Sequence, residues 1–240
     1  MLKGHTIPVL GNGYVRYIDH LGDDLRIVET ARISYKSPSK GEDADKKLLF
    51  YLFKNRHTSP FEACNVTFNI KMPIFCMRQF VRHRTFRLNE WSGRYSELAD
   101  EFYTPAAWRL QDTKNKQGSL LPGQHDFLQT KDNIPYWHEE NSRIASECFR
   151  RCYESYQELL DRGVAKELAR IVLPVSLFTE IYINTDVHNL IHFLNLRQDP
   201  HAQLEMIEIA NAMATIFEEL FPWCAEARSK YKLTVVETGS

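Results

Sequence analysis

The sequence has no long apolar run, almost no net charge and no sign of a targeting segment. No stretch reaches the ~18 consecutive apolar residues of a membrane-spanning helix. The N-terminus lacks a basic segment followed by a hydrophobic one, so no signal peptide is indicated. The formal net charge of −1 gives no global attraction to nucleic acid or to a membrane. We therefore expect a cytoplasmic protein with neither as a partner.

The common nucleotide-binding and metal-binding motifs are also missing. With only 10 glycines the chain has no G-x-G-x-x-G loop, so a dinucleotide would have to be held by side chains. His188 and His192 are four residues apart, but no His-Glu-x-x-His pattern completes a zinc site. The chain has five cysteines, and this odd number favours reduced thiols. We interpret Cys148 and Cys152 as small buried residues, and we expect no metal.

What is present indicates one globular domain of the α+β class. The 240 residues are 43% hydrophobic, which suffices for a substantial core. Apolar residues alternate in the predicted strands and recur at helical spacing in the predicted helices. Strands are expected at residues 14–18, 66–72 and 175–183, and helices at 23–32, 43–56, 136–162, 165–174, 186–197 and 200–221, with a further helix beginning after Pro73.

Three finer expectations follow from these patterns. Leu25 and Val28 should lie on the buried side of the first helix, and a stripe of Ile144, Cys148 and Tyr156 should bury the long helix at 136–162. Residues 111–135 are polar and turn-rich, which indicates a surface insertion without chemistry of its own.

Residues 82–95, RHRTFRLNEWSGRY, are the most informative stretch. Four arginines, a histidine, a glutamate, an asparagine and a serine follow an apolar run within fourteen positions. Cations at a helix end can simply complement the helix dipole, and this explains two of the arginines. Guanidinium groups also bind phosphate, and carboxylate, amide and hydroxyl groups suit a sugar or base. The mixture favours a polar loop that binds a nucleotide.

This stretch resembles the signature of the flavin-dependent thymidylate synthases. The signature runs Arg-His-Arg, seven residues, Ser, with Asn-Glu before the serine and Arg-Tyr after it. Every fixed position is matched; Arg87 replaces a residue that is small and polar in many members. The matching residues are Arg82, His83, Arg84, Asn89, Glu90, Ser92, Arg94 and Tyr95.

Four further segments resemble elements of the same family. They are Ala31-Arg32-Ile33-Ser34, the His57 to Glu62 segment HTSPFE, the Ala169 to Pro174 segment ARIVLP, and Asn195-Leu196-Arg197 with Asp199 and His201. Arg170 stands among apolar residues, and an arginine buried there would need an anionic partner, either structural or substrate. Asp186 departs from the asparagine of many relatives but can cap the helix that follows.

The resemblance implies a fold, a reaction and a set of binding residues. It implies an antiparallel sheet packed with helices, assembled as a homotetramer with sites between subunits. It implies methylation of dUMP to dTMP with carbon from methylenetetrahydrofolate, hydride from reduced FAD, and NADPH as the reductant of the flavin. The implied dUMP ligands are Gln79, Arg82, Glu90, Ser92, Gly93, Arg94, Arg170 and Arg197, of which Arg197 is also catalytic. The implied FAD ligands are Ser34, His57, Ser59, Arg82, His83, Arg84, Asn89, Glu90, Asp186, His188, His192 and His201.

Two other classes of protein are weighed against this one. An RNA-binding module could use the basic stretch with Trp91 and Tyr95 as stacking platforms, but the balanced charge argues against it. A methylase with a cysteine nucleophile could use Cys224, but nothing adjacent to Cys224 is an obvious base. For Ser34, local sequence makes a simple helix-end hydroxyl as plausible as a ligand contact. A histidine before Ser-Pro, such as His57, is on sequence alone more often a turn or helix-end residue than a catalyst.

Overall fold

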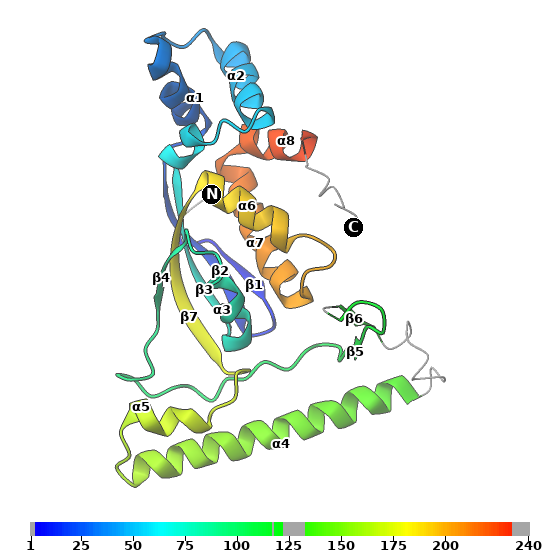
Figure 1. The fold of residues 1–240 in the computed structure, drawn as a ribbon. Coiled ribbons are helices and arrows are strands. Elements are labelled where there is room, and N and C mark those ends of the chain that lie inside the picture. Colours follow the sequence, from blue (N-terminus) through cyan, green and yellow to red (C-terminus); the bar gives the residue numbers. More distant parts are fainter. Residues whose placement is uncertain (1–2, 117, 122–132, 232–240) are drawn as a thin grey trace.

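Five strands form an antiparallel sheet in the order β1-β2-β3-β7-β4 (Figure 1). The computed structural model describes residues 3–116, 118–121 and 133–231. The strands are β1 (Thr6–Val9), β2 (Gly13–Leu21), β3 (Asn65–Pro73), β4 (Arg87–Glu90) and β7 (Phe178–Asp186). The predicted mixture of helices with an antiparallel sheet is confirmed.

The pairing of β3 with β7 forms the centre of the sheet. The register runs from Asn65 opposite Asp186 to Pro73 opposite Phe178. Even the polar Asn69 in the middle of β3 is fully buried, and its amide donates to Glu180 Oε1 at 2.9 Å. A buried amide in a central strand needs such an internal partner, because water cannot reach its polar atoms.

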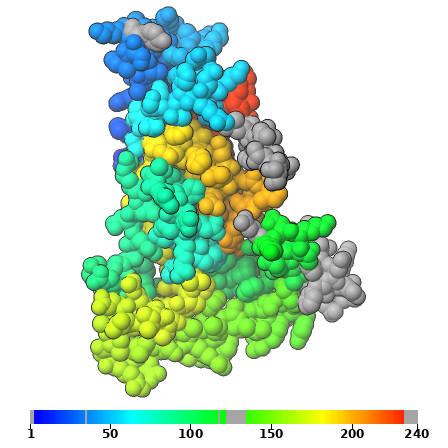
Figure 2. Space-filling model, in the orientation of Figure 1, coloured from blue at the N-terminus to red at the C-terminus, as the bar shows by residue number. Residues whose placement is uncertain are grey.

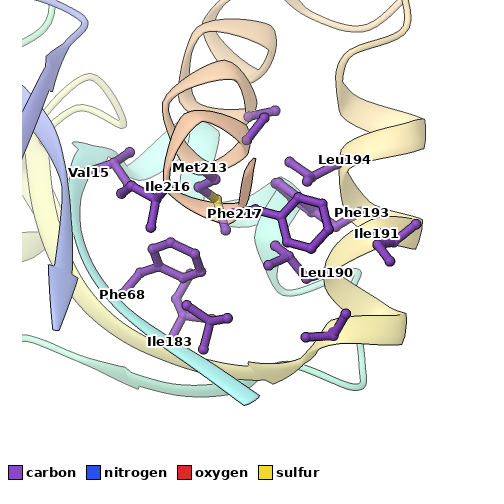
Figure 3. Close-up of a cluster of buried hydrophobic side chains, with 14 of the residues drawn as sticks. Val15, Phe68, Ile183, Leu190, Ile191, Phe193, Leu194, Met213, Ile216 and Phe217 are labelled. Atoms are coloured by element: carbon purple, nitrogen blue, oxygen red, sulfur yellow. The ribbon is translucent and has the colours of Figure 1, made fainter. Parts of the chain in front are cut away.

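Helices α6 (Val187–Arg197) and α7 (Leu204–Leu220) cover one face of this sheet. Figure 3 shows their apolar side chains meeting those of three strands in one cluster. Each side chain is completely removed from solvent, which is the main stabilising contribution of the fold. The cluster includes Val15, Phe68 and Ile183 from the strands, Leu190 and Phe193 from α6, and Met213, Ile216 and Phe217 from α7.

Three helices cluster at one end of the sheet, and the longest helix lies beyond the other end (Figure 1). The first group is α1 (Asp24–Arg32), α2 (Glu42–Lys54) and α8 (Pro222–Lys230). The long helix is α4 (Asn133–Asp161), followed by α5 (Lys166–Ala169) and the 3-10 turn η4 (Arg170–Val172). Figure 2 shows α4 and α5 as a layer beneath the rest of the molecule. Within the described ranges, no helix is both long and apolar enough to cross a membrane.

Segment 98–108 attaches α4 to the sheet. The Tyr156 hydroxyl accepts from Leu98 N at 3.1 Å, Trp108 Nε1 donates to Ser142 Oγ at 2.9 Å, and Phe102 stacks on Phe149. The stripe predicted to bury this helix is therefore partly wrong. Tyr156 is buried, but Ile144 is 54% exposed and Cys148 is exposed, because α4 rests on segment 98–108 through a different face.

The prediction for the first helix is confirmed for Val28 and wrong for Leu25. Leu25 is 46% exposed, whereas Ile27 and Val28 are buried. The reason is that α1 packs on α2, on α8 and on the 3-10 turn η2 (Ser59–Ala63), which together select the face carrying Ile27 and Val28.

Three predicted boundaries also differ from the structure. The stretch 82–95 is not a loop throughout, because Arg87–Glu90 forms edge strand β4 against β7. β7 begins at Phe178 rather than at residue 175, after a turn in which Leu177 N bonds Pro174 O. The last long helix begins at Leu204 rather than Pro200, because Asp199 Oδ1 accepts from His201 N in a separate turn.

The predicted insertion at 111–135 is described only in part. Leu110–Gln111 (β5) pairs with Ser119–Leu120 (β6) in a short hairpin. Residue 117 and residues 122–132 lie outside the described ranges. α3 (Ile74–Phe80) begins directly after Pro73, as the sequence predicted.

A buried carboxylate links helix α1 to helix α8. Asp24, at the start of α1, accepts hydrogen bonds from Trp223 N at 2.8 Å and Cys224 N at 3.1 Å. Both donors lie in the first turn of α8, where backbone N–H groups have no partner inside the helix. Burial raises the pKa of Asp24, so these bonds compensate a desolvated carboxylate.

Replacing this carboxylate should destabilise the whole fold. Asp24→Ala is expected to lower the free energy of unfolding by about 2–3 kcal/mol, because two buried N–H groups lose their acceptor. Asp23→Ala is the matched control: Asp23 is exposed and caps α1 through Arg26 N alone, so the expected loss is about 1 kcal/mol. Urea unfolding of both variants gives the comparison, and equal losses would contradict the role given to Asp24.

Candidate functional site

The candidate residues lie at three separate places within one copy of the chain. The first is a pocket beside α2 and α6, the second is a pocket at the β4 edge of the sheet, and the third is a polar cluster between α3 and the end of α6. The two pockets have no lining residue in common. The candidates at these places are His57, His188 and His192 in the first pocket, Glu90, Ser92, Gly93 and Arg170 in the second, and Gln79, His83 and Arg197 in the cluster.

The first pocket is lined partly by apolar side chains and partly by histidine, arginine and asparagine side chains. It has a volume of about 230 Å³, and Phe53, Phe61 and Ile191 form part of its apolar wall. His188 and His192 both line it, as expected for residues four apart on one helix. A flat aromatic ligand with polar edges suits such a lining.

Sequence reasoning missed Arg228 in this pocket. The side chain is buried, and its guanidinium donates to Asn195 Oδ1 and Gln198 Oε1, both at 2.7 Å. Burial lowers its pKa, and among the described residues no carboxylate lies within ion-pairing distance. The sequence held one indication that Arg228 is buried. Arg228 follows Cys224, which is buried, by four positions, so the two side chains lie on one face of the helix.

The second pocket collects the end of the 82–95 stretch. It measures about 250 Å³, and Thr179 Oγ1 donates to Glu90 Oε1 at 2.7 Å on its wall. A Cβ at Gly93 would stand 2.9 Å from Leu98 Cδ1, so a larger residue here would have to displace the Leu98 side chain. Trp91 also lines the pocket beside Ser92. An indole and a set of hydrogen-bonding groups on one wall suit a nucleotide.

Arg170 reaches this pocket from the surface. The sequence suggested an arginine buried among apolar residues, but Arg170 is exposed and so is Ile171, because η4 lies on the outside of the fold. Arg94 is also exposed and lies 3.3 Å from Glu167 Oε2. A surface ion pair of this kind stabilises little, so an anionic ligand could replace Glu167 at small cost.

Arg197 is the last residue of α6, and its guanidinium donates hydrogen bonds to neutral acceptors. Its Nε donates to His83 Nε2 and its Nη1 donates to Gln79 Oε1, both at 3.1 Å. Within the described part of the chain, no carboxylate lies within ion-pairing distance of this guanidinium. Asp199, two residues further along the chain, is not an ion-pair partner of Arg197 and bonds His201 instead. The positive charge of Arg197 therefore stays available to a ligand.

His83 is held in its neutral form. Burial, followed by the charge of Arg197, lowers its pKa to about 4. The ring packs edge-on against Phe193 with centroids 4.8 Å apart. Because Nε2 accepts from Arg197, the proton of the neutral ring lies on Nδ1.

The remaining candidates lie on the surface or at a helix end. Asp186 caps α6 by accepting from Asn189 N at 2.8 Å, which confirms the predicted cap. The structure brings none of the other candidates into the two pockets, and they are exposed: Ser34, Ser59, Arg82, Arg84, Asn89 and His201. Among described residues, no three His, Cys, Asp or Glu side chains gather as a possible metal site.

The neutral state of His83 predicts a pH dependence of stability. Between about pH 6.5 and pH 4 the unfolded chain binds a proton that the folded ring does not, so the free energy of unfolding falls as the pH is lowered through this window. His83→Gln should remove this contribution, of at most about 1.4 kcal/mol per pH unit. Urea unfolding of both proteins at several pH values measures it, and parallel pH profiles would count against a neutral His83.

Comparison with known proteins gives one consistent result. The family model described as thymidylate synthase complementing protein matches residues 16–223. A protein of Kosmotoga olearia named flavin-dependent thymidylate synthase is 43% identical over 228 residues, covering 95% of each chain. A protein of the same name from Thermus thermophilus is 45% identical over 225 residues, covering 92% of this chain and 77% of its own.

A solved structure is similar over nearly the same length. The UMP/dUMP methylase PolB from Streptomyces cacaoi, bound with 5-Br dUMP, superposes with a TM-score of 0.80 at 32% identity. The match covers 93% of this chain and 97% of that chain.

Proposed function

Because this chain belongs to the flavin-dependent thymidylate synthase family, we propose that it converts dUMP to dTMP by reductive methylation. Methylenetetrahydrofolate is the carbon donor, NADPH is the reductant, and bound FAD supplies the hydride. The enzyme is a methyltransferase that works in the cytoplasm without a cysteine nucleophile. The observation that carries the proposal is the guanidinium of Arg197, which is held in place by neutral acceptors alone.

Arg197 is the proposed catalytic residue. C5 of uracil must act as a nucleophile toward the one-carbon donor, and the ring that attacks carries enolate-like negative charge on its carbonyl edge. A fixed cation beside that edge stabilises this charge. A carboxylate partner would cancel this field, whereas Gln79 and neutral His83 orient the guanidinium without opposing it. Partial burial makes the interaction stronger than it would be in water.

The second pocket is the proposed nucleotide side of the site. Arg170, which lines this pocket, and Arg94, which follows the lining residue Gly93, bind the phosphate of dUMP, with Ser92, Gly93 and Glu90 on the pocket wall. Gln79 and Arg82, which lie outside the pocket, are the further proposed dUMP ligands. Exposed guanidiniums at a pocket mouth suit bidentate contacts to phosphate.

The first pocket fits the flavin ring but not a whole dinucleotide. Its volume of about 230 Å³ is below the roughly 300–1,000 Å³ of ordinary small-molecule sites. Its apolar wall and its histidines suit a flat ring with polar edges, and the exposed guanidiniums of Arg82 and Arg84 suit the diphosphate. The other proposed FAD ligands are Ser34, Ser59, His83, Asn89, Glu90, Asp186 and His201.

These FAD ligands are spread over separate surfaces of one copy, so we propose that the site is completed between subunits of a homotetramer. Exposed apolar side chains support such contacts: Ile144 is 54% exposed, and Ile171 and Tyr95 are each 76% exposed. We propose that the chain acts as a single domain with a surface insertion at 111–135, of which the structure describes residues 111–116, 118–121 and 133–135.

The cysteines support a mechanism that does not use a thiolate. Cys64, Cys76 and Cys224 are buried, and burial raises the pKa of each thiol above its usual value. A neutral buried thiol is a poor nucleophile. A protein with all five cysteines changed to serine should stay active if it folds.

One assay tests the proposed function. The purified protein should show flavin absorbance and release tritium from 5-tritiated dUMP when methylenetetrahydrofolate, FAD and NADPH are present. Arg197→Lys should still oxidise NADPH yet release tritium at least about 100-fold more slowly, because an ammonium cannot reproduce the planar fork of the guanidinium.

The two half-reactions separate a catalytic Arg197 from a structural one. A helix-end cation that serves only the fold would tolerate lysine at little cost in either half-reaction. Near-normal dTMP formation by Arg197→Lys would remove Arg197 from the chemistry, and a colourless protein without tritium release would refute the function itself.

A further inference from the structure

A buried carboxylate lies two side chains away from Arg197. Glu205, in the first turn of α7, is 3% exposed. Arg109 Nη2 donates to both of its oxygens at 2.8 Å, and the Tyr103 hydroxyl donates to Oε1 at 3.0 Å. Burial alone would raise the pKa of Glu205, but the bonds from Arg109 and its other donors hold that pKa below its usual value. Glu205 is therefore a fixed anion.

Two glutamine amides connect this anion to Arg197. Gln203 Nε2 donates to Glu205 Oε2 at 2.9 Å, and Gln203 Oε1 accepts from Gln79 Nε2. Gln79 Oε1 then accepts from Arg197 Nη1 at 3.1 Å. The four side chains form a continuous row of hydrogen bonds that starts at a carboxylate and ends at a guanidinium.

The two ends of the row fix the orientation of both amides. A carboxylate can only accept and a guanidinium can only donate, whereas an amide presents an oxygen on one side and an NH₂ group on the other. If Gln79 turned over, its NH₂ group would face the N–H groups of Arg197. If Gln203 turned over, its oxygen would face the carboxylate of Glu205. Only the observed orientation pairs every donor with an acceptor.

We propose that Glu205 is a positioning residue, which acts through Gln203 and Gln79 to hold the guanidinium of Arg197 in its working orientation. This inference rests on the function proposed above. It also connects the site to the surface hairpin, because Arg109 precedes β5 and its Nε donates to Ser119 Oγ of β6 at 2.9 Å.

The most direct variant breaks the row without exposing a charge. Gln203→Met keeps the length of the side chain and leaves the Arg109–Glu205 pair intact. We expect kcat for tritium release to fall on the order of 10- to 100-fold, because a small misplacement of a catalytic group has an effect of this size. The KM for dUMP should change much less, since the loss concerns the transition state.

The matched control removes a different bond to the same carboxylate. Tyr103→Phe deletes the hydrogen bond to Oε1 but leaves Oε2 with Gln203. It should lower the midpoint of urea unfolding at least as much as Gln203→Met while keeping kcat within about two-fold. Similar losses of kcat in the two variants would overturn the proposal, because they would indicate general loosening.

A double-mutant cycle tests whether the effect passes through Arg197. In the Arg197→Lys background, Gln203→Met should cost little further kcat, since the group that it positions is already gone. Independent, multiplying losses would overturn the proposal.

A measurement on the protein without substrates keeps this inference separate from the proposed function. The side-chain Nε–H signal of Arg197 in ¹⁵N NMR, assigned by its loss in Arg197→Lys, should be sharp in the parent protein and in Tyr103→Phe, and should broaden in Gln203→Met. A signal unchanged in Gln203→Met would refute the positioning role. The failure of tritium release in the parent protein would refute the function and leave this result standing.

Discussion

The antiparallel pairing of β3 with β7 is the constraint on which the site geometry depends. Its register sets the starts of α3 and α6 at opposite ends of the two strands, at Pro73 and Asp186. α6 therefore runs back along the sheet and ends where α3 ends. Phe193 secures this meeting, because its ring packs on Phe80 and His83 with centroids 5.0 and 4.8 Å apart. A slip of one residue in the pairing would turn the side chains of β7 to the other face and separate the two helices.

The fold keeps two partly or fully buried guanidiniums that make no ion pair with a carboxylate among the described residues. Arg197 and Arg228 each donate to neutral oxygen or nitrogen acceptors, and burial lowers the pKa of both. Hydrogen bonds to neutral groups recover part of the desolvation cost. Glu218 compensates part of the charge of Arg228 from beyond ion-pairing distance, whereas the charge of Arg197 has no such compensation among the described residues. An anionic ligand would complete the compensation, so the folded chain is organised for binding negative charge although its net charge is only −1.

The local patterns of the sequence predicted the helices and strands better than they predicted which surfaces these elements pack against. The cap at Asp186 and the shared face of His188 and His192 depend on neighbours within one turn, and the structure confirms them. The burial predicted for Ile144 and Arg170 was wrong, since both are exposed. An apolar pattern predicts that residues pack against another surface, but it does not identify that surface. Glu205 was missed because its partners come from distant segments, and nothing near it in the sequence marks the row that leads to Arg197.

We propose that the nucleotide pocket of one copy works with Arg197 of another, because the two lie at different places within one copy. Subunit mixing tests it most directly: Arg170→Ala and Arg197→Lys are each purified inactive, unfolded together and refolded as mixed assemblies. If the site lies between copies, pairing the two variants gives one site in which both arginines are intact and one in which both are replaced. On random mixing about one quarter of all sites are intact, so about one quarter of the parent tritium release returns. If each copy holds a complete site, mixing restores nothing, and that result would contradict the account.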